Sequence, residues 1–150
     1  MAETTCDIII HAPPEIVYTV LWDASRYPEF ISDVIEADVS PNATSTAQTI
    51  HFHLQLIRTL SYSVQMQGTP VHRIDWTLAG TSEFLQEHSG SWKVEPSADR
   101  RTCRLEYFLN IHFSIAIPDA VIRRLIDFNM PTMLRQIKAR AEAMTRDMAH

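Results

Sequence analysis

The sequence predicts an α+β fold: a curved antiparallel sheet of seven strands around one long C-terminal helix, with two short helices between the first and second strands. Two patterns predict it. Through most of residues 34–115, apolar and polar residues alternate with a period of two, which is typical of strands with one buried face. From Pro118 onward, apolar residues recur every three or four positions, the spacing of one helical face. Such a helix needs a concave surface, which a twisted sheet supplies.

The first strand is predicted at residues 4–11, where Cys6, Ile8 and Ile10 share one face. Pro13 and Pro14 then start a short helix that continues to about residue 23, because proline suits a first helical turn. A second short helix is predicted around residues 27–32. The alternating region follows, and its predicted strands are 34–39, 49–56, 61–67, 72–78, 84–94 and 103–115.

The final helix is predicted from Asp119 to Arg146, and Pro131 interrupts it. A proline there removes the backbone hydrogen bond to residue 127, so we expect a kink. The part after Pro131 has the steadier apolar stripe and is expected to pack as core. The part before it, which ends with Phe128 and Asn129, is expected to act as a lid over the mouth of any cavity.

The composition limits the class of protein. The chain has 150 residues, 45% of them hydrophobic, and a formal net charge of −5. This length suits one domain over residues 1–150, and the net charge argues against a DNA-binding protein driven by bulk charge. No apolar run approaches the roughly 18 residues of a membrane helix, and the N-terminus does not resemble a signal peptide. We therefore expect a cytoplasmic protein without a transmembrane segment, while its oligomeric state stays open.

Neither a cofactor nor a metal is predicted. The sequence contains no GxGxxG or GxxxxGK[ST] motif for nucleotide phosphates. Cys6 and Cys103 lie in apolar segments and are expected to be buried thiols. His51 and His53 share a strand face, but that face is polar and no carboxylate or thiol joins them, whereas metal sites usually need three or four ligands.

Four stretches resemble the START-like superfamily, in particular its polyketide cyclase/dehydrase and coenzyme Q-binding (COQ10-like) branch. They are Ala12–Tyr18 (APPEIVY), Asp23–Phe30 (DASRYPEF), Gly90–Val94 (GSWKV) and Pro131–Lys138 (PTMLRQIK). The resemblance covers nearly the whole chain and implies the helix-grip fold. It also implies a hydrophobic ligand, because members of the superfamily bind lipids, quinones, polyketides or plant hormones, and some act as cyclases.

The residues that face the predicted helix are mostly large and apolar, which is typical either of a packed core or of a ligand pocket. Methionines on the helix adapt to ligands of irregular shape. The candidate ligand-binding residues are Tyr62, Met66, Trp76, Gln86, His88, Trp92, Tyr107, Asn129, Met130 and Met133.

Polar side chains on this face are the informative ones, because each needs a protein, water or ligand partner. Gln86 and His88 are two positions apart and are expected to point inward together, with Tyr107 on the next strand completing the cluster. His88 can equally be a core histidine satisfied by protein groups. Arg58 and His72 lie near strand ends, where solvent is expected to reach them.

Three functions remain open. The first is a carrier or chaperone for a lipid, isoprenoid quinone or polyketide-like molecule, which requires an internal cavity above about 300 Å³. The second is a polyketide aromatase/cyclase or dehydratase without a cofactor, with His88 and Tyr107 as the catalytic residues. The third is an interaction module like the related ribosome-association proteins, using either the exposed face of the sheet or basic residues of the helix such as Arg123 and Arg124.

Overall fold

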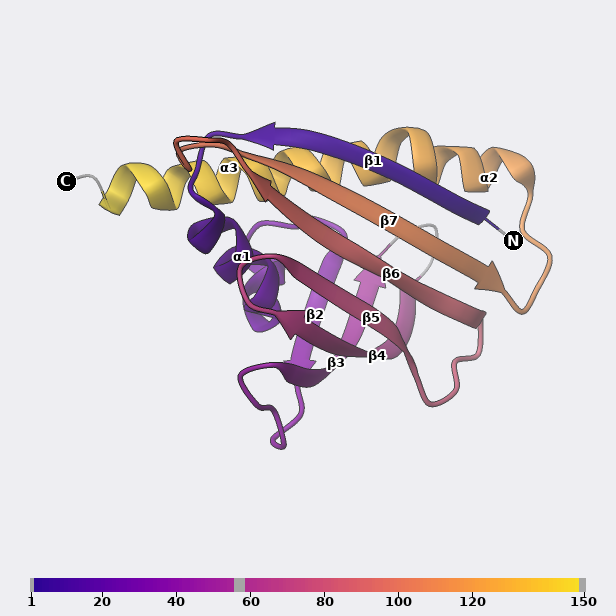
Figure 1. The fold of residues 1–150 in the computed structure, drawn as a ribbon. Coiled ribbons are helices and arrows are strands. Elements are labelled where there is room, and N and C mark those ends of the chain that lie inside the picture. The colour runs from indigo at the N-terminus through magenta and orange to yellow at the C-terminus, as the bar shows by residue number, and fades with distance from the viewer. Residues whose placement is uncertain (1, 56–58, 149–150) are drawn as a thin grey trace.

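One curved antiparallel sheet is the framework of the protein (Figure 1). The computed structural model describes residues 2–55 and 59–148, so the predicted positions of Leu56 and Arg58 fall outside the described residues. Within the described ranges, seven strands are ordered β1-β7-β6-β5-β4-β3-β2. Their bounds are β1 (Ala2–Ile10), β2 (Val34–Val39), β3 (Ala47–Gln55), β4 (Thr59–Thr69), β5 (Arg73–Ala79), β6 (Leu85–Pro96) and β7 (Cys103–Phe113). The predicted fold is therefore confirmed.

Two short helices follow β1, as predicted. The first, α1 (Pro14–Trp22), begins with proline at its first position and buries most of its apolar residues. The second, η1 (Ala24–Glu29), is a 3₁₀ helix that starts three residues earlier than predicted. The reason is local: α1 ends at Trp22, and the backbone N–H of Arg26 already donates to Asp23 at 3.2 Å, so the tighter helix begins immediately.

The C-terminal helix has three parts in succession: α2 (Asp119–Arg124), the π-helical turn η2 (Leu125–Asn129) and α3 (Met130–Met148). The N–H of Met130 donates to the carbonyl of Leu125, five residues back. Pro131 comes immediately afterwards and has no N–H to donate. The wider turn accommodates the proline, so the predicted interruption takes the form of a π turn within a continuous helix. Figure 1 shows this helix running alongside β1.

A β-bulge changes which residues of β6 face inward. The register between β6 and β7 shifts between Leu85 and Glu87. An extra residue in one strand reverses the side-chain alternation beyond it. Leu85 is consequently buried at 3% exposure, and Gln86 is exposed. The prediction that Gln86 points inward beside His88 is therefore wrong.

The two ends of the C-terminal helix are held to very different extents. The apolar stripe of α3 buries Met130, Leu134, Ile137 and Ala141. Its polar side is also attached, because Lys138 Nζ donates to the carbonyl oxygen of Ile9 at 2.7 Å. Lys138 also pairs with Glu142 at 2.6 Å.

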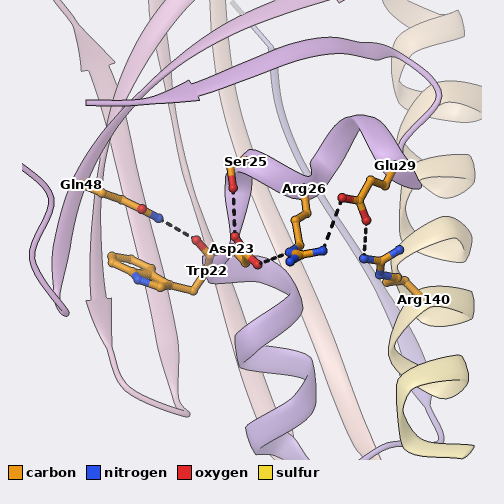
Figure 2. A network of polar contacts seen from close by, with 7 residues as sticks. All are labelled: Trp22, Asp23, Ser25, Arg26, Glu29, Gln48 and Arg140. Carbon is orange, nitrogen blue, oxygen red and sulfur yellow. Dashed lines mark hydrogen bonds and ion pairs between the residues drawn. The ribbon is translucent and has the colours of Figure 1, made fainter. Parts of the chain in front are cut away.

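A second polar network attaches α3 to η1 (Figure 2). Arg140 donates to Glu29 at 2.7 Å, and Glu29 also lies 3.5 Å from Arg26, which pairs with Asp23 at 3.0 Å. The guanidinium of Arg140 lies 5.1 Å above the ring of Phe30. These contacts hold η1 and the following Phe30 against α3.

By contrast, α2 and η2 contain no buried residue. Phe128 is 52% exposed, and the guanidinium of Arg124 lies 4.8 Å from the centroid of its ring. Among the described residues, the one side-chain hydrogen bond from these two elements to the rest of the protein is Asn129 Nδ2 to Asp33 Oδ2, at 3.0 Å.

None of the helices in the described part of the chain has the length and the apolar character that crossing a membrane requires.

Candidate ligand-binding site

A cavity lies between the concave face of the sheet and the C-terminal helix, with a volume of about 160 Å³. Side chains from the strands form its walls, and side chains from α2, η2 and the start of α3 cover it. Nine of the ten candidate ligand-binding residues line it, namely Tyr62, Met66, Trp76, His88, Trp92, Tyr107, Asn129, Met130 and Met133. Gln86 does not, because the bulge turns it to solvent.

Three further polar residues line the cavity that the sequence did not predict, namely Thr4 of β1, Tyr27 and Asp33. Tyr27 belongs to η1, and its hydroxyl donates to the carbonyl oxygen of Leu21. Asp33 lies at the mouth and accepts the hydrogen bond from Asn129. The only sequence signal for Tyr27 was its place in the DASRYPEF stretch, and nothing in the local pattern connects Asp33 with a residue 96 positions away.

Aromatic rings form the deepest wall of the cavity. Trp92 and Tyr107 have ring centroids 4.3 Å apart, and Trp76 stacks on Tyr107 at 5.5 Å with an angle of 20° between the ring planes. The ring of Tyr62 lies 4.8 Å from that of His88. Offset and tilted arrangements of this kind are the favourable ones for aromatic pairs. The result is a cavity wall made largely of packed aromatic rings.

Gly90 makes this arrangement possible. A Cβ atom at Gly90 would lie 2.5 Å from the nearest carbon of the Trp76 indole and would also collide with the backbone carbonyl of Phe108. Without a side chain at this position, the indole of Trp76 lies directly across β6. The glycine of the GSWKV stretch therefore has a steric role, which is to let Trp76 reach His88.

His88 is the central polar group of the wall. The indole N–H of Trp76 donates to its Nδ1 at 3.1 Å. Burial lowers the pKa of His88 to about 4, and a backbone hydrogen bond only partly offsets this. His88 is therefore neutral at physiological pH. Tyr107 does not bond to His88 directly; Trp76 lies beside both, since its ring centroid is 6.2 Å from that of His88.

The tyrosines of the cavity stay protonated. Burial raises the pKa of Tyr62 and of Tyr107 well above the usual value. Among the described residues, neither hydroxyl has a hydrogen-bond partner in the protein. Both hydroxyls are therefore available to a ligand.

The other candidate groups lie away from the cavity. His51 Nδ1 is 2.8 Å from Ser63 Oγ, and His53 Nδ1 is 2.6 Å from Ser61 Oγ. In the described part of the chain, no group of three or more His, Cys, Asp or Glu side chains is arranged to hold a metal ion. Burial raises the pKa of the free thiols of Cys6 and Cys103 to about 11, so both are protonated.

Arg123 and Arg124 are exposed on α2, and their predicted part in ribosome association stays a prediction. His72 is exposed, as expected.

Comparison with known proteins places this architecture among the helix-grip folds. The chain belongs to the family described as "Polyketide cyclase / dehydrase and lipid transport", whose model matches residues 10–138. The predicted START-like resemblance is thus confirmed, although nothing in the match singles out the coenzyme Q-binding branch. A search of curated proteins found no sequence match.

Several solved structures share the fold. The Zhui aromatase/cyclase from Streptomyces sp. R1128 has a TM-score of 0.82 at 15% identity, over 94% of this chain and 93% of that one. A START superfamily protein from Mycobacterium smegmatis also scores 0.82, at 10% identity, over 95% and 99%. A STAR-related lipid transfer protein from Xanthomonas axonopodis scores 0.78, at 14% identity, over 93% and 85%. At these identities the likeness shows the fold alone.

Proposed function

We propose that this protein binds a hydrophobic small molecule that contains a planar ring, in the cavity between the sheet and the C-terminal helix, as a carrier or chaperone. One observation carries the proposal: an aromatic-walled cavity lies beneath a helical segment, α2 and η2, that buries none of its own residues. A helix segment that contributes only partly buried side chains is a poor core element. It is well suited to a cover that must open and close.

The volume of the closed cavity limits what it holds. Pockets that enclose drug-sized ligands have volumes of roughly 300–1,000 Å³. At about 160 Å³, this cavity is smaller than the volume predicted above for a carrier. Dry cavities of about this size hold a single benzene ring in other proteins. In the conformation described, the cavity therefore fits one ring, and full enclosure of a lipid, an isoprenoid quinone or a polyketide-like chain requires α2 and η2 to move outward.

Outward movement of the cover breaks few interactions. It separates Asn129 from Asp33 and exposes the half-buried faces of apolar residues such as Leu125 and Ile126. The anchors of α3 are untouched, because they lie after the π turn. The lid predicted from the sequence is thus proposed to be α2 and η2, with η2 as the hinge.

Native mass spectrometry of the protein purified from its own host tests the proposal. We expect a retained small molecule of discrete mass, released on unfolding. Met133→Trp, which adds bulk at the cavity wall, is expected to lose it. Met148→Trp is the matched control, because Met148 lies on the same helix but is 73% exposed. A wild-type protein that neither retains a molecule nor takes up single-ring compounds in solution contradicts the proposal.

A second function, an aromatase/cyclase or dehydratase acting in the same cavity, is favoured by the position of His88 and Tyr107 on its wall. In that case His88 and Tyr107 are the proposed catalytic residues, since each can hydrogen-bond to a bound oxygen. Conversion of a synthetic polyketone substrate, compared between wild type and His88→Ala, tests it. Equal turnover by both proteins rules out His88 as catalytic.

A further inference from the structure

We propose that Trp76 holds His88 in the tautomer that carries its proton on Nε2, and that this N–H selects ligands with an oxygen acceptor on a planar ring. The ligand class is aryl ketones, quinones, and phenolates or enolates. This inference rests on the proposed function, because it concerns the ligand of the same cavity. It specifies the direction of one hydrogen bond in the site: His88 Nε2–H donates, and an oxygen of the ligand accepts.

The tautomer follows from the chemistry of the two rings. An indole nitrogen can only donate a hydrogen bond. Because Trp76 Nε1 lies 3.1 Å from His88 Nδ1, this Nδ1 must be the unprotonated acceptor. A neutral imidazole has one proton, which is therefore on Nε2. Gly90 supports the arrangement by leaving room for the indole.

The Nε2–H group is left to the ligand. His88 lines the cavity, and among the described residues no protein group accepts a hydrogen bond from its Nε2. A buried N–H without a hydrogen-bond partner costs free energy. An apolar ligand that displaces water from Nε2 incurs this cost, because it offers no acceptor in return. A ligand with an oxygen at this point removes it.

The surroundings of His88 narrow the ligand class further. The hydroxyls of Tyr62 and Tyr107 are also free of protein partners, and both remain donors because their pKa values are raised. The one carboxylate on the wall, Asp33, is at the mouth and already accepts from Asn129. Apart from Asp33, the cavity lining therefore offers N–H and O–H donors and no anion, which disfavours cationic amines and favours ligands with oxygen acceptors.

Two probes of similar shape separate this inference from the proposed function. Acetophenone carries a carbonyl acceptor, and cumene replaces it with a methyl group. Calorimetric or NMR titration is made with wild type, His88→Phe and His88→Gln. Glutamine is the conservative variant, because its side-chain amide can donate from nearly the same place as Nε2.

We expect His88→Phe to weaken acetophenone binding about 3- to 10-fold, as for the loss of one hydrogen bond, and to change cumene binding less than twofold. His88→Gln should recover most of the acetophenone affinity. If both probes bind and neither responds to His88→Phe, this inference is wrong and the proposed function stands. If neither probe binds wild type, the proposed function fails, and the inference fails with it.

The positioning role of Trp76 has its own spectroscopic signature. ¹⁵N NMR of the histidine ring should show His88 with a protonated Nε2 and an unprotonated Nδ1 across the pH range 6–8. Trp76→Phe keeps an aromatic ring but removes the donor, so a signal from the Nδ1-protonated tautomer should appear. A merely structural role for Trp76 would not move this ratio. A wild-type His88 protonated on Nδ1 would overturn the inference.

Discussion

The two ends of the C-terminal helix belong to one continuous helix but are built for different tasks. After the π turn, α3 buries an apolar stripe and is hydrogen-bonded to β1 through Lys138, to η1 through Arg140, and to the backbone of His11 through Glu142. Before it, α2 and η2 contain no fully buried residue, and among the described side chains only that of Asn129 hydrogen-bonds to the rest of the protein. With α2 and η2 as the proposed lid, stability and access to the cavity depend on separate parts of the helix, so either should change with little effect on the other.

The largest expected difference between α3 and the α2–η2 segment is in how much their apolar side chains stabilise the fold. Leu134→Ala removes a side chain that is 2% exposed, so it should lower the free energy of unfolding by about 2–5 kcal/mol. Leu125→Ala removes the same atoms from the half-buried cover and should cost less than about 1 kcal/mol. Urea unfolding of both variants measures the difference. Equal losses would mean that the cover is part of the core.

Glu142 provides a test through pH. Burial alone would raise the pKa of Glu142, but hydrogen bonds from Lys138 and from the backbone N–H of His11 outweigh it and bring the pKa below its usual value. Its contribution is then present above the unfolded-state pKa and is lost as pH falls through the folded-state pKa. We expect Glu142→Gln to cost about 1 kcal/mol near pH 7 and to weaken the acid sensitivity below about pH 5.

Unfolding curves of wild type and Glu142→Gln between pH 3 and 7 check this expectation. Glu83→Gln is the control, because Glu83 is exposed on the loop before β6 and touches neither part of the helix through its carboxylate. Parallel stability curves for wild type and Glu142→Gln would show that the carboxylate does not anchor α3.

Arginine substitutions in α3 and α2 are expected to differ less in their effect on stability. Arg140→Gln removes the ion pair with Glu29 and the contact with the Phe30 ring, which should cost about 0.5–1 kcal/mol. Arg124→Gln removes only the contact with Phe128 inside the cover, so no change beyond measurement error is expected. Thermal unfolding at low and high salt separates the two. A larger loss for Arg124→Gln would reverse the comparison.

The smallest stability effect should come from the hydrogen bond that closes the mouth. Asn129→Ala removes the bond to Asp33 at a half-buried position, so global stability should change by less than about 0.5 kcal/mol. Opening should nevertheless become easier, and ligand association and dissociation should both accelerate about 2- to 5-fold. Stopped-flow binding of a fluorescent single-ring ligand measures both rates. Unchanged rates would indicate that ligands enter by another route.

Most of the fold was predictable because alternation and helical spacing are local properties of the chain. The strands, the order of elements and the inward position of His88 follow from them. The inward position predicted for Gln86 was wrong because strict alternation assumes a strand without a bulge. The β-bulge beside Gln86 depends on how β6 pairs with β7, which the local sequence does not show. The contact of Asp33 with Asn129 depends in the same way on how distant segments meet.

The hydrogen bond between Trp76 and His88 was also beyond sequence reasoning. It depends on a glycine in the adjacent strand and on the exact lie of two rings, neither of which periodicity describes. The cavity volume is even harder to predict from the sequence, because it is the small space left after large side chains pack under the helix. Alternation and helical spacing predicted that these residues would face one another, but not how completely they would fill the space between them.

The π turn is equivalent to one extra residue inserted into an α-helix. If a single residue were deleted between Leu125 and Asn129, η2 would shorten to an ordinary α-helical turn, and α2 would rotate by about 100° relative to α3. The anchored half would keep its place, while a different side of α2 would face the cavity. Insertions and deletions at this point of the chain therefore offer a way to change the cover of the cavity while preserving the fold beneath it.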